Sequence, residues 1–266
     1  MKERISIEVR AGVADVRLIR VDKMNALDPA MFDALIEAGE QLKTDAGVRA
    51  AVLSGDGRAF CAGLDMSNFG RMAEGGGRDL IDGPRTAAGA NRAQQAAMIW
   101  RDAPVPVIAA VHGVAFGGGL QVALGADMRF VTPDARLSIM EIKWGLVPDM
   151  AGFALLRALV RDDVARELTY TGRIFSGEEA LAMGLATRVC ADPRAEALAL
   201  AAEIASKSPH AVRAAKRLLN LAVSGADQAQ VLKAESAEQA ALIGSPNQAE
   251  AVNANLQKRA PDFANP

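Results

Sequence analysis

The sequence predicts an α/β protein that ends in a helical region. Apolar runs of strand length alternate with segments of helical periodicity up to about residue 191. From about residue 192 onward the pattern is helical only. Runs of small residues also follow two of the apolar strands directly, at 58–66 and 112–121. We therefore expect an α/β core over 1–191 and a helical C-terminal region over 192–266.

The first elements are expected to be a hairpin and a helix. Residues 5–9 and 13–18 alternate between apolar and polar, and Ala11-Gly12 lies between them, as in a β-hairpin. Asp28-Pro29 combines an N-cap residue with a proline in the first helical turn. Apolar residues then recur at helical spacing as far as Lys43, which predicts a helix.

The alternation of strands and helices continues through the middle of the chain. Strands are expected at 49–54, 105–111, 127–131 and 136–138. Helices are expected from about 85 to 102 and over 122–127, and a glycine segment at 75–77 is expected to form a mobile loop. The expected C-terminal helices lie at 195–207, 209–223, 226–243 and 247–259.

Composition excludes several classes of function. Half of the 266 residues are hydrophobic, which is enough for a large core, and the net charge of −2 argues against nucleic-acid binding. Two cysteines and two histidines are too few for a metal site. No apolar run is long enough to span a bilayer, and the charged N-terminus lacks the apolar core of a signal peptide. We therefore expect a soluble cytoplasmic protein.

The most informative segment is the glycine-rich junction His112–Gln121, which follows the apolar strand at 105–111. Three consecutive glycines lose much backbone freedom on folding, and such a run is tolerated where a ligand approaches the backbone closely. The unpaired N–H groups at a helix N-terminus attract anions. The junction is a candidate oxyanion site, and a plain tight turn is the alternative.

A second segment, Arg58–Met66, also follows a buried strand and can present the backbone N–H of Leu64. Two N–H groups, one from each segment, could converge on a single oxygen atom. That arrangement stabilises a developing enolate or a tetrahedral oxyanion.

Five segments in order resemble the signatures of the crotonase superfamily, which includes the enoyl-CoA hydratases and isomerases. They are R-V-D-K-M-N-A-L at 20–27, F-C-A-G-L-D at 60–65, H-G-V-A-F-G-G-G-L-Q at 112–121, M-E-I-K-W-G-L-V-P-D at 140–149 and T-G-R-I-F-S-G-E-E-A at 171–180. The resemblance implies a spiral of repeated β-β-α units. It also implies a helical C-terminal region that closes the site and forms a homotrimer or a dimer of trimers.

The resemblance assigns roles to several residues. The N–H groups of Leu64 and Gly118 match the oxyanion donors, and Glu141 matches the catalytic base. Glu141 lies between apolar residues, and partial burial would raise its pKa. A surface glutamate in a charged loop is the alternative for Glu141.

Gln121 departs from the pattern of the hydratases. Those relatives use two glutamates to hold and split a water molecule, and the position of the second one is occupied here by Gln121. A neutral amide cannot act as a general acid or base. Gln121 is therefore either a pocket residue without a catalytic role or a hydrogen-bonding partner of substrate or water.

Asp149 matches a carboxylate of the dienoyl-CoA isomerases, in which it and the carboxylate matching Glu141 move protons between substrate carbons. The alternative for Asp149 is an N-cap of the helix that begins near Ala151. Two carboxylates and an oxyanion hole suffice for a proton shuttle. The residues therefore favour migration of a double bond over addition of water.

Coenzyme A requires cationic contacts for its phosphates and a pocket for its adenine. The resemblance assigns this binding to Lys23, Ala26, Ala62, Asp65, Met66, Lys258 and Phe263. The two C-terminal residues would reach a nucleotide near a subunit boundary, although a surface lysine is more commonly just solvated. We expect an acyl-CoA substrate, the thioester being the substrate rather than a cofactor, and no metal.

The interpretation that we favour is an isomerase of enoyl-CoA thioesters that works by carboxylate proton transfer. An enoyl-CoA hydratase with an altered acid–base pair is the first alternative. The second alternative is a trimer that binds acyl-CoA without catalysis, against which the presence of Glu141 and Asp149 argues.

Overall fold

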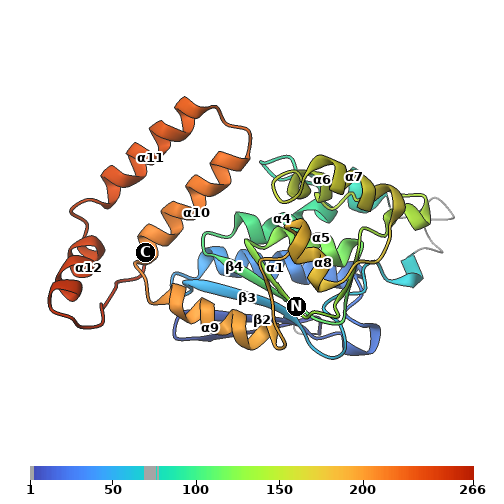
Figure 1. Cartoon of the computed structure of the whole chain (residues 1–266), viewed down its shortest axis with the longest axis horizontal. Helices are drawn as coiled ribbons and strands as arrows, with labels where there is room; N and C mark the ends of the chain where they lie inside the picture. The colour runs from blue at the N-terminus through green and yellow to red at the C-terminus, as the bar shows by residue number, and fades with distance from the viewer. Residues whose placement is uncertain (1–2, 69–75, 77) are drawn as a thin grey trace.

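A mostly parallel six-stranded sheet lies at the centre of the computed structural model, which describes residues 3–68, 76 and 78–266 (Figure 1). Across this sheet the strands are β1 (Ile5–Arg10), β2 (Val13–Leu18), β3 (Ala50–Gly55), β4 (Val107–Val111), β6 (Met128–Val131) and β8 (Arg188–Val189). Only β1 and β2 pair antiparallel among these strands. A smaller parallel sheet joins β5 (Val114–Phe116) to β7 (Arg136–Ser138). The α/β class is therefore confirmed.

Helices cover both faces of the large sheet. In chain order the helical segments are η1 (Val21–Lys23), α1 (Pro29–Thr44), α3 (Asp79–Asp82), α4 (Arg92–Asp102), α5 (Gly118–Gly125), η2 (Glu141–Trp144), α6 (Gly152–Leu156), α7 (Asp162–Thr171), α8 (Gly177–Met183), α9 (Pro193–Ala205), α10 (Pro209–Val223), α11 (Gln228–Leu242) and α12 (Pro246–Leu256). Side chains alternate along β3, so that Ala51 and Leu53 share a core with α1 and α4, whereas Ala50 and Val52 pack against α9.

The middle of the chain repeats one β-β-α unit. Strand β4 joins the large sheet, β5 joins the small one, and α5 follows. Strands β6 and β7 repeat that order, and α8 closes the unit after an insertion that holds α6 and α7. The loop after β3 also pairs with the small sheet, through a bridge between Cys61 and Ala115. This repeat places the loops after β3 and β4 side by side.

Two helices begin several residues away from the predicted start, whereas the other expected helices differ from the prediction by no more than three residues at their ends. Helix α4 begins at Arg92 instead of near residue 85, because Asn91 forms a capping box with Gln94. Helix α5 begins at Gly118 instead of residue 122, so that two of the three glycines lie inside it. Tertiary packing explains this choice, since a Cβ added at Gly119 would lie 2.4 Å from the carbonyl oxygen of Cys61. Of the expected mobile loop at 75–77, residues 75 and 77 lie outside the described residues.

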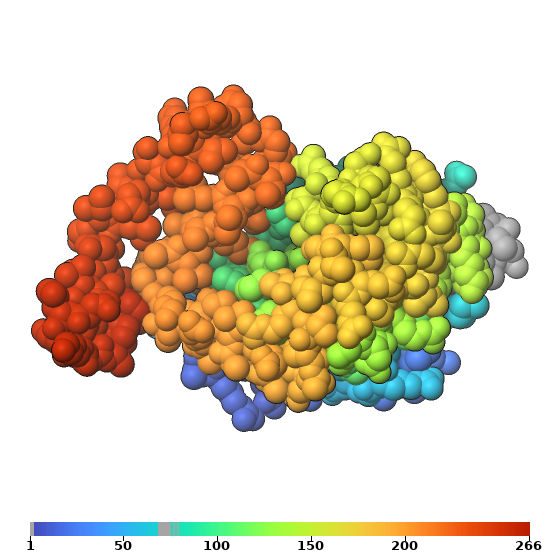
Figure 2. All heavy atoms as spheres, viewed as in Figure 1, coloured from blue at the N-terminus to red at the C-terminus, as the bar shows by residue number. Residues whose placement is uncertain are grey.

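The last three helices, α10 to α12, extend away from the sheet (Figures 1 and 2). None of the α11 residues, all of which the structure describes, is buried. Lys216 of α10 is the main anchor, because its Nζ donates to the carbonyl oxygens of Trp100 and Val105 and to Asp127 Oδ2, at 2.8–3.0 Å. In the described ranges, no helix combines the length and the apolarity needed to cross a membrane.

Candidate active site

A cavity of about 630 Å³ opens between the loop after β3, the start of α5 and the segment from η2 to α6. Most residues that the sequence singles out line it: Lys23, Ala26, Ala62, Leu64, Asp65, Met66, Gly118, Gln121, Glu141 and Asp149. Lys258 and Phe263 do not line the cavity of their own chain. They follow α12, where the chain returns to the base of α10 (Figure 1), and Phe263 is buried there with its carbonyl oxygen accepting from Arg49 Nη2 at 2.6 Å. Their expected contact with a nucleotide at a subunit boundary stays a prediction.

The loops after β3 and β4 are held together by a short ladder of backbone hydrogen bonds. The N–H of Phe60 donates to the carbonyl of His112 at 3.0 Å, and that of Cys61 donates to Val114 at 3.1 Å. In the other direction, the N–H of Phe116 donates to the carbonyl of Cys61 at 3.1 Å. The glycine-rich junction and the loop that carries Leu64 are therefore one structural unit.

Gly63 allows this contact to continue to the edge of the cavity. Its φ of +87° lies in the left-handed region, and an added Cβ would be 2.5 Å from the carbonyl oxygen of Phe116 and 3.8 Å from the nitrogen of Gly118. Leu64 follows Gly63 directly. The structure thus brings the predicted pair of N–H donors, Leu64 and Gly118, onto adjacent loops at the wall of one cavity.

Both of these N–H groups are available for a ligand. The N–H of Leu27 donates to the carbonyl of Gly63, and the carbonyl of Leu27 accepts from the N–H of Asp65. The N–H of Leu64, between these two residues, has no acceptor among the described residues. Gly118 is the first residue of α5, and the first N–H groups of a helix have no partner within it. Two unpaired donors side by side can hold an oxygen that gains negative charge.

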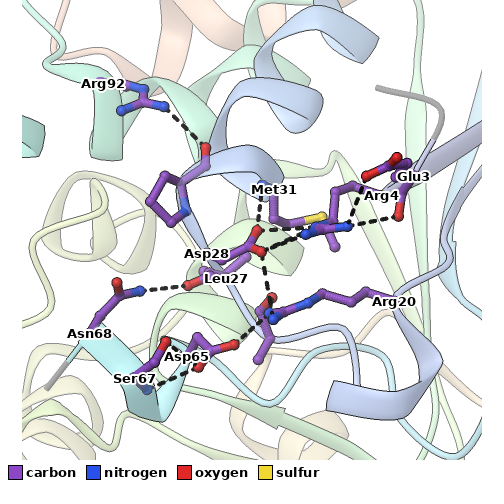
Figure 3. A network of polar contacts seen from close by, with 12 residues as sticks. Glu3, Arg4, Arg20, Leu27, Asp28, Met31, Asp65, Ser67, Asn68 and Arg92 are labelled. Carbon is purple, nitrogen blue, oxygen red and sulfur yellow. Dashed lines mark hydrogen bonds and ion pairs between the residues drawn. The ribbon is translucent and has the colours of Figure 1, made fainter.

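A partly buried polar network holds the Leu64 loop in place (Figure 3). Arg20 donates from Nη1 to Asp65 Oδ2 at 2.6 Å and to the carbonyl oxygen of Ala26 at 2.9 Å. The other oxygen of Asp65 accepts from the backbone N–H and the hydroxyl of Ser67. Hydrogen bonds from Ser67, together with the Arg20 guanidinium, lower the pKa of Asp65 to about 2. Asp65 is therefore a charged anchor of the loop.

The same network continues to the N-terminus of α1. Asp28 caps that helix by accepting from the N–H of Met31 at 2.8 Å. Its other oxygen, Oδ2, accepts from Arg4 Nη2 at 2.8 Å and lies 3.5 Å from Arg20 Nη2. Alternating cations and carboxylates thus connect the residue before β1, the segment after β2, the N-terminus of α1 and the Leu64 loop (Figure 3).

Glu141 lies in surroundings that oppose its charge. It begins η2, only 9% of its surface is exposed, and its Oε2 makes no hydrogen bond with the described residues. Burial raises the pKa of the carboxyl, and the nearby charge of Asp149 acts in the same direction. Gly117 makes room for it, since a Cβ added there would lie 3.1 Å from Glu141 Oε1. The alternative of a surface glutamate is wrong.

Gln121 makes three hydrogen bonds from the buried face of α5. Its Nε2 donates to Glu141 Oε1 at 2.6 Å. Its Oε1 accepts from the N–H of Met150 at 2.8 Å and from the N–H of Gly152 at 3.0 Å. The side chain is 2% exposed. It thus connects the candidate base to the segment that carries Asp149.

Asp149 lies at the cavity wall and is exposed, although the surrounding protein still raises its pKa by desolvation. It does not cap α6. The N-cap of that helix is Ala151, in the left-handed conformation and without a side-chain cap. The N-cap alternative is therefore wrong, and the side chain remains available to the cavity.

Sequence reasoning missed Gly117 and Arg20 as parts of the site. Gly117 lies within the glycine run and has a φ of +51°, so its proximity to Glu141 could have been suspected from the run alone. Arg20 belongs to the first of the five signature segments. Its bond to Asp65 joins residues 45 positions apart, and no local pattern marks such a pair.

Other reactive side chains near these loops have structural roles. Cys61 is buried and donates from Sγ to the carbonyl oxygen of Asn25, and burial raises its pKa to about 12. His112 contacts the carbonyl oxygen of Gly57 through Nε2 at 2.9 Å. Among the described residues there is no group of three or more histidine, cysteine, aspartate or glutamate side chains that could hold a metal ion.

A family model for enoyl-CoA hydratase/isomerase matches residues 8–266 of the chain. The chain belongs to the enoyl-CoA hydratase/isomerase family. A probable enoyl-CoA hydratase of Bacillus subtilis is 35% identical over 265 residues, which span 97% of this chain and 98% of that protein. The mitochondrial Delta(3,5)-Delta(2,4)-dienoyl-CoA isomerase of Mus musculus is 34% identical over 229 residues, 79% of this chain and 67% of that protein. The family thus includes relatives named for either reaction.

Solved structures of the family share the fold along nearly the whole chain. An enoyl-CoA hydratase from Bacillus anthracis superposes with a TM-score of 0.89 at 29% identity, covering 98% of both chains. A putative enoyl-CoA hydratase from Streptomyces coelicolor A3(2) also gives 0.89, at 32% identity, covering 98% of this chain and 94% of that one. The crotonase-type fold that the sequence resemblance implies is therefore confirmed.

Proposed function

We propose that this family member moves a double bond within an enoyl-CoA thioester by carboxylate proton transfer. One observation carries the proposal. A buried carboxyl oxygen without a hydrogen-bond partner among the described residues, Glu141 Oε2, belongs to the same cavity as two unpaired backbone donors and a second carboxyl group, Asp149. A thioester needs these parts for proton removal next to its carbonyl carbon and for proton return elsewhere.

The first step forms an enolate. The thioester oxygen lies between the N–H groups of Leu64 and Gly118, which stabilise the negative charge that develops on it. Glu141 removes the proton from the α-carbon, and the electron pair of the broken C–H bond shifts toward the carbonyl. Burial supports this role, since a carboxylate with a raised pKa is a stronger base at neutral pH.

The second step returns a proton to the far carbon of the migrating double bond, and Asp149 is its source. Desolvation favours the protonated form of Asp149, as a proton donor requires. The substrate keeps its composition, and proton exchange between the carboxyls and solvent resets the site. The reaction requires no cofactor besides the thioester substrate itself.

Coenzyme A enters at the end of the cavity formed by Lys23, Ala26 and the segment from Ala62 to Met66. The Lys23 ammonium is exposed at this end and is suited to contact a phosphate. Lys258 and Phe263 contribute only where another subunit brings them to a nucleotide. The extended C-terminal helices support the proposal of a homotrimer or a dimer of trimers.

Incubation of the protein with 3-enoyl-CoA and 2-enoyl-CoA substrates of several chain lengths in D₂O tests the proposal. Mass spectrometry should show conversion of 3-enoyl to 2-enoyl thioester with deuterium incorporation and no gain of water. Glu141→Gln is the control that should abolish exchange. Rapid gain of water by the 2-enoyl thioester, without isomerisation, would refute the proposed reaction.

Hydration is the second candidate, and it is favoured by the relatives named as enoyl-CoA hydratases, which match 97% of this chain. Gln121 argues against the two-carboxylate form of this reaction. Both acceptor positions of its carbonyl oxygen are used by Met150 and Gly152, and an amide does not exchange protons at neutral pH. The same experiment distinguishes the two reactions.

A further inference from the structure

The amide of Gln121 is held in one orientation. Its Oε1 accepts from two backbone N–H groups, those of Met150 and Gly152, so this atom must be the carbonyl oxygen. Its Nε2 must then face Glu141, where it donates to Oε1 at 2.6 Å. The side chain is almost completely buried, and water does not compete for these bonds. An amide flip would place two donors against two backbone donors.

Gly152 shows that the surrounding chain is built to receive this amide. A Cβ added at Gly152 would lie 2.7 Å from Gln121 Oε1 and 2.9 Å from Cβ of Pro148. Ala151, between the two donating residues, has a φ of +64°, a conformation that a non-glycine residue adopts at a cost. The two N–H groups therefore converge on one acceptor because the turn before α6 is bent to present them.

The consequence for Glu141 is an asymmetric carboxylate. Oε1 is occupied by the amide donor, whereas Oε2 is buried and makes no hydrogen bond with the described residues. A proton is accepted more readily by the oxygen that has no donor against it. Oε2 is thus the oxygen that exchanges a proton with substrate.

We propose that Gln121 is a positioning residue that makes Oε2 of Glu141 the reacting oxygen and fixes the turn that carries Asp149. This inference rests on the proposed proton-transfer function. The same turn brings Met150 next to the oxyanion donor, since a Cβ added at Gly118 would lie 2.7 Å from the sulfur of Met150. One amide thus connects the base, the second carboxyl and the wall beside the oxyanion site.

A glutamate at position 121 could not donate a hydrogen bond to Glu141 Oε1 in its charged form. One carboxylate oxygen would accept from Met150 and Gly152, and the other would face Glu141 Oε1 at about the distance of the present hydrogen bond, 2.6 Å. Two carboxylate oxygens so close must share a proton. Because residue 121 is a glutamine, Glu141 titrates independently and acts as a single base.

Few charged groups bear on that titration. Asp149, from the turn before α6, is the carboxylate whose charge acts on Glu141, and Gln121 of α5 supplies the side-chain hydrogen bond. Burial opposes the charged form, whereas the backbone N–H of Glu141 itself and the Gln121 donor at Oε1 favour it. Loss of the donor should therefore raise the pKa of Glu141 further.

NMR titration of protein labelled with ¹³C at the glutamate carboxyls tests the proposal without substrate. The Glu141 resonance is assigned by its absence in Glu141→Gln. In Gln121→Met, which keeps the side-chain length but neither donates to Glu141 nor accepts from the turn, the Glu141 midpoint should rise by about one pH unit. In Gln121→Glu, residues 121 and 141 should titrate as a coupled pair. An unchanged Glu141 midpoint in folded Gln121→Met would overturn the proposal.

Two further variants separate positioning from general structural damage. Gly152→Ala keeps the Gln121 residue but displaces its side chain, because the added Cβ would lie 2.7 Å from Oε1, and it should shift the Glu141 midpoint in the same direction. Gln95→Met changes another buried glutamine, which lies on α4 outside the cavity lining. It should leave the midpoint unchanged, and an equal shift in this variant would contradict the assignment.

Activity then distinguishes the two proposals. The pH profile of kcat should move with the NMR midpoint in Gln121→Met, while KM for the thioester changes much less. If the wild-type protein isomerises no enoyl-CoA but the NMR shifts appear, the proposed reaction fails and the positioning role stands. If the protein isomerises enoyl-CoA and neither midpoint nor pH profile moves, the positioning role fails alone.

Discussion

Glu141 combines burial with an unpaired oxygen, and both properties can be tested by one isosteric change. Glu141→Gln removes the proposed proton acceptor without changing the volume of the side chain. We expect kcat for double-bond migration to fall by about 10²- to 10⁴-fold, the contribution typical of a general base. Binding of the CoA thioester, measured by calorimetry, should change little. A variant that retains most of its activity would exclude Glu141 as the base.

The same variant should be more stable than the wild type at neutral pH. Because the folded-state pKa of Glu141 is raised, its carboxyl favours folding in the protonated form, and that contribution is lost as pH rises through the folded-state pKa. Urea unfolding at several pH values should show the advantage of Glu141→Gln at pH 7. The gain in unfolding free energy should be on the order of 1 kcal/mol. The advantage should shrink below about pH 4, near the ordinary pKa of a glutamate, and a difference independent of pH would contradict this account.

At the residue scale, the sequence predicts the backbone N–H donors of the site better than it predicts the hydrogen bonds between side chains. The donors at Leu64 and Gly118 could be inferred because small residues follow two parallel strands, whose carboxyl ends meet at one edge of a sheet. The three bonds of Gln121 could not be inferred. They join residues 20 to 31 positions apart, and their geometry depends on the left-handed turn at Ala151.

Among the elements, the Leu64 loop depends on ion pairs that lie outside the cavity wall. Arg20→Met should release Asp65 from its strongest cationic partner and loosen the loop that presents the N–H of Leu64. We expect kcat to fall by about tenfold or more, since one donor of an oxyanion site contributes at least that much. Steady-state kinetics with the best substrate from the D₂O experiment provide the measurement.

Arg92→Met is the matched control for this change. Arg92 also contacts the start of α1, through the carbonyl oxygen of Pro29 and the carboxylate of Asp33, but it does not contact the Leu64 loop (Figure 3). It should keep nearly full activity. Equal losses in the two variants would show that α1, and not the loop, is the sensitive element.

Glycine positions explain why one element boundary escaped prediction. Glycine is a poor helix former, which argues for starting α5 after the glycine run. The contact with Cys61 overrides that preference, because α5 packs so closely against the neighbouring loop that a side chain at Gly119 would meet its backbone. Tertiary approach of this kind is invisible in a single segment of sequence. By contrast, the expected helix at 209–223 is confirmed as α10, because its proline start and apolar periodicity are local.

For the whole molecule, the extended C-terminal helices expose apolar side chains that the core leaves uncovered. Leu219, Ile243 and Leu256 are each exposed by about two thirds or more. We expect the native protein to have three or six times the mass of one chain, because burial of such residues between chains is favourable. Light scattering after size-exclusion chromatography measures this mass, and a monomer at micromolar concentration would contradict the proposed assembly.

Substitution of aspartate for these leucines, Leu219→Asp and Leu256→Asp, should lower the measured mass. Val9→Asp, at an exposed apolar residue of β1, is the control and should leave the measured mass unchanged.

The positions of the C-terminal helices along the chain could be predicted from their periodicity. The direction in which these helices extend from the sheet could not be predicted. The contacts that fix them join residues far apart in the sequence, and the anchor at Lys216 depends on carbonyl groups more than 100 residues away.

The burial of Cys61 has a consequence for oxidation chemistry. The loop that presents Leu64 carries one of the two thiols of the chain, and that thiol is inaccessible and remains protonated at physiological pH. Thiolate is the form that peroxide and alkylating reagents attack. Cys190, which is partly exposed, therefore reacts first with such reagents. The loop is therefore spared thiol modification, and a single probe can be attached at Cys190, which lies outside the cavity lining.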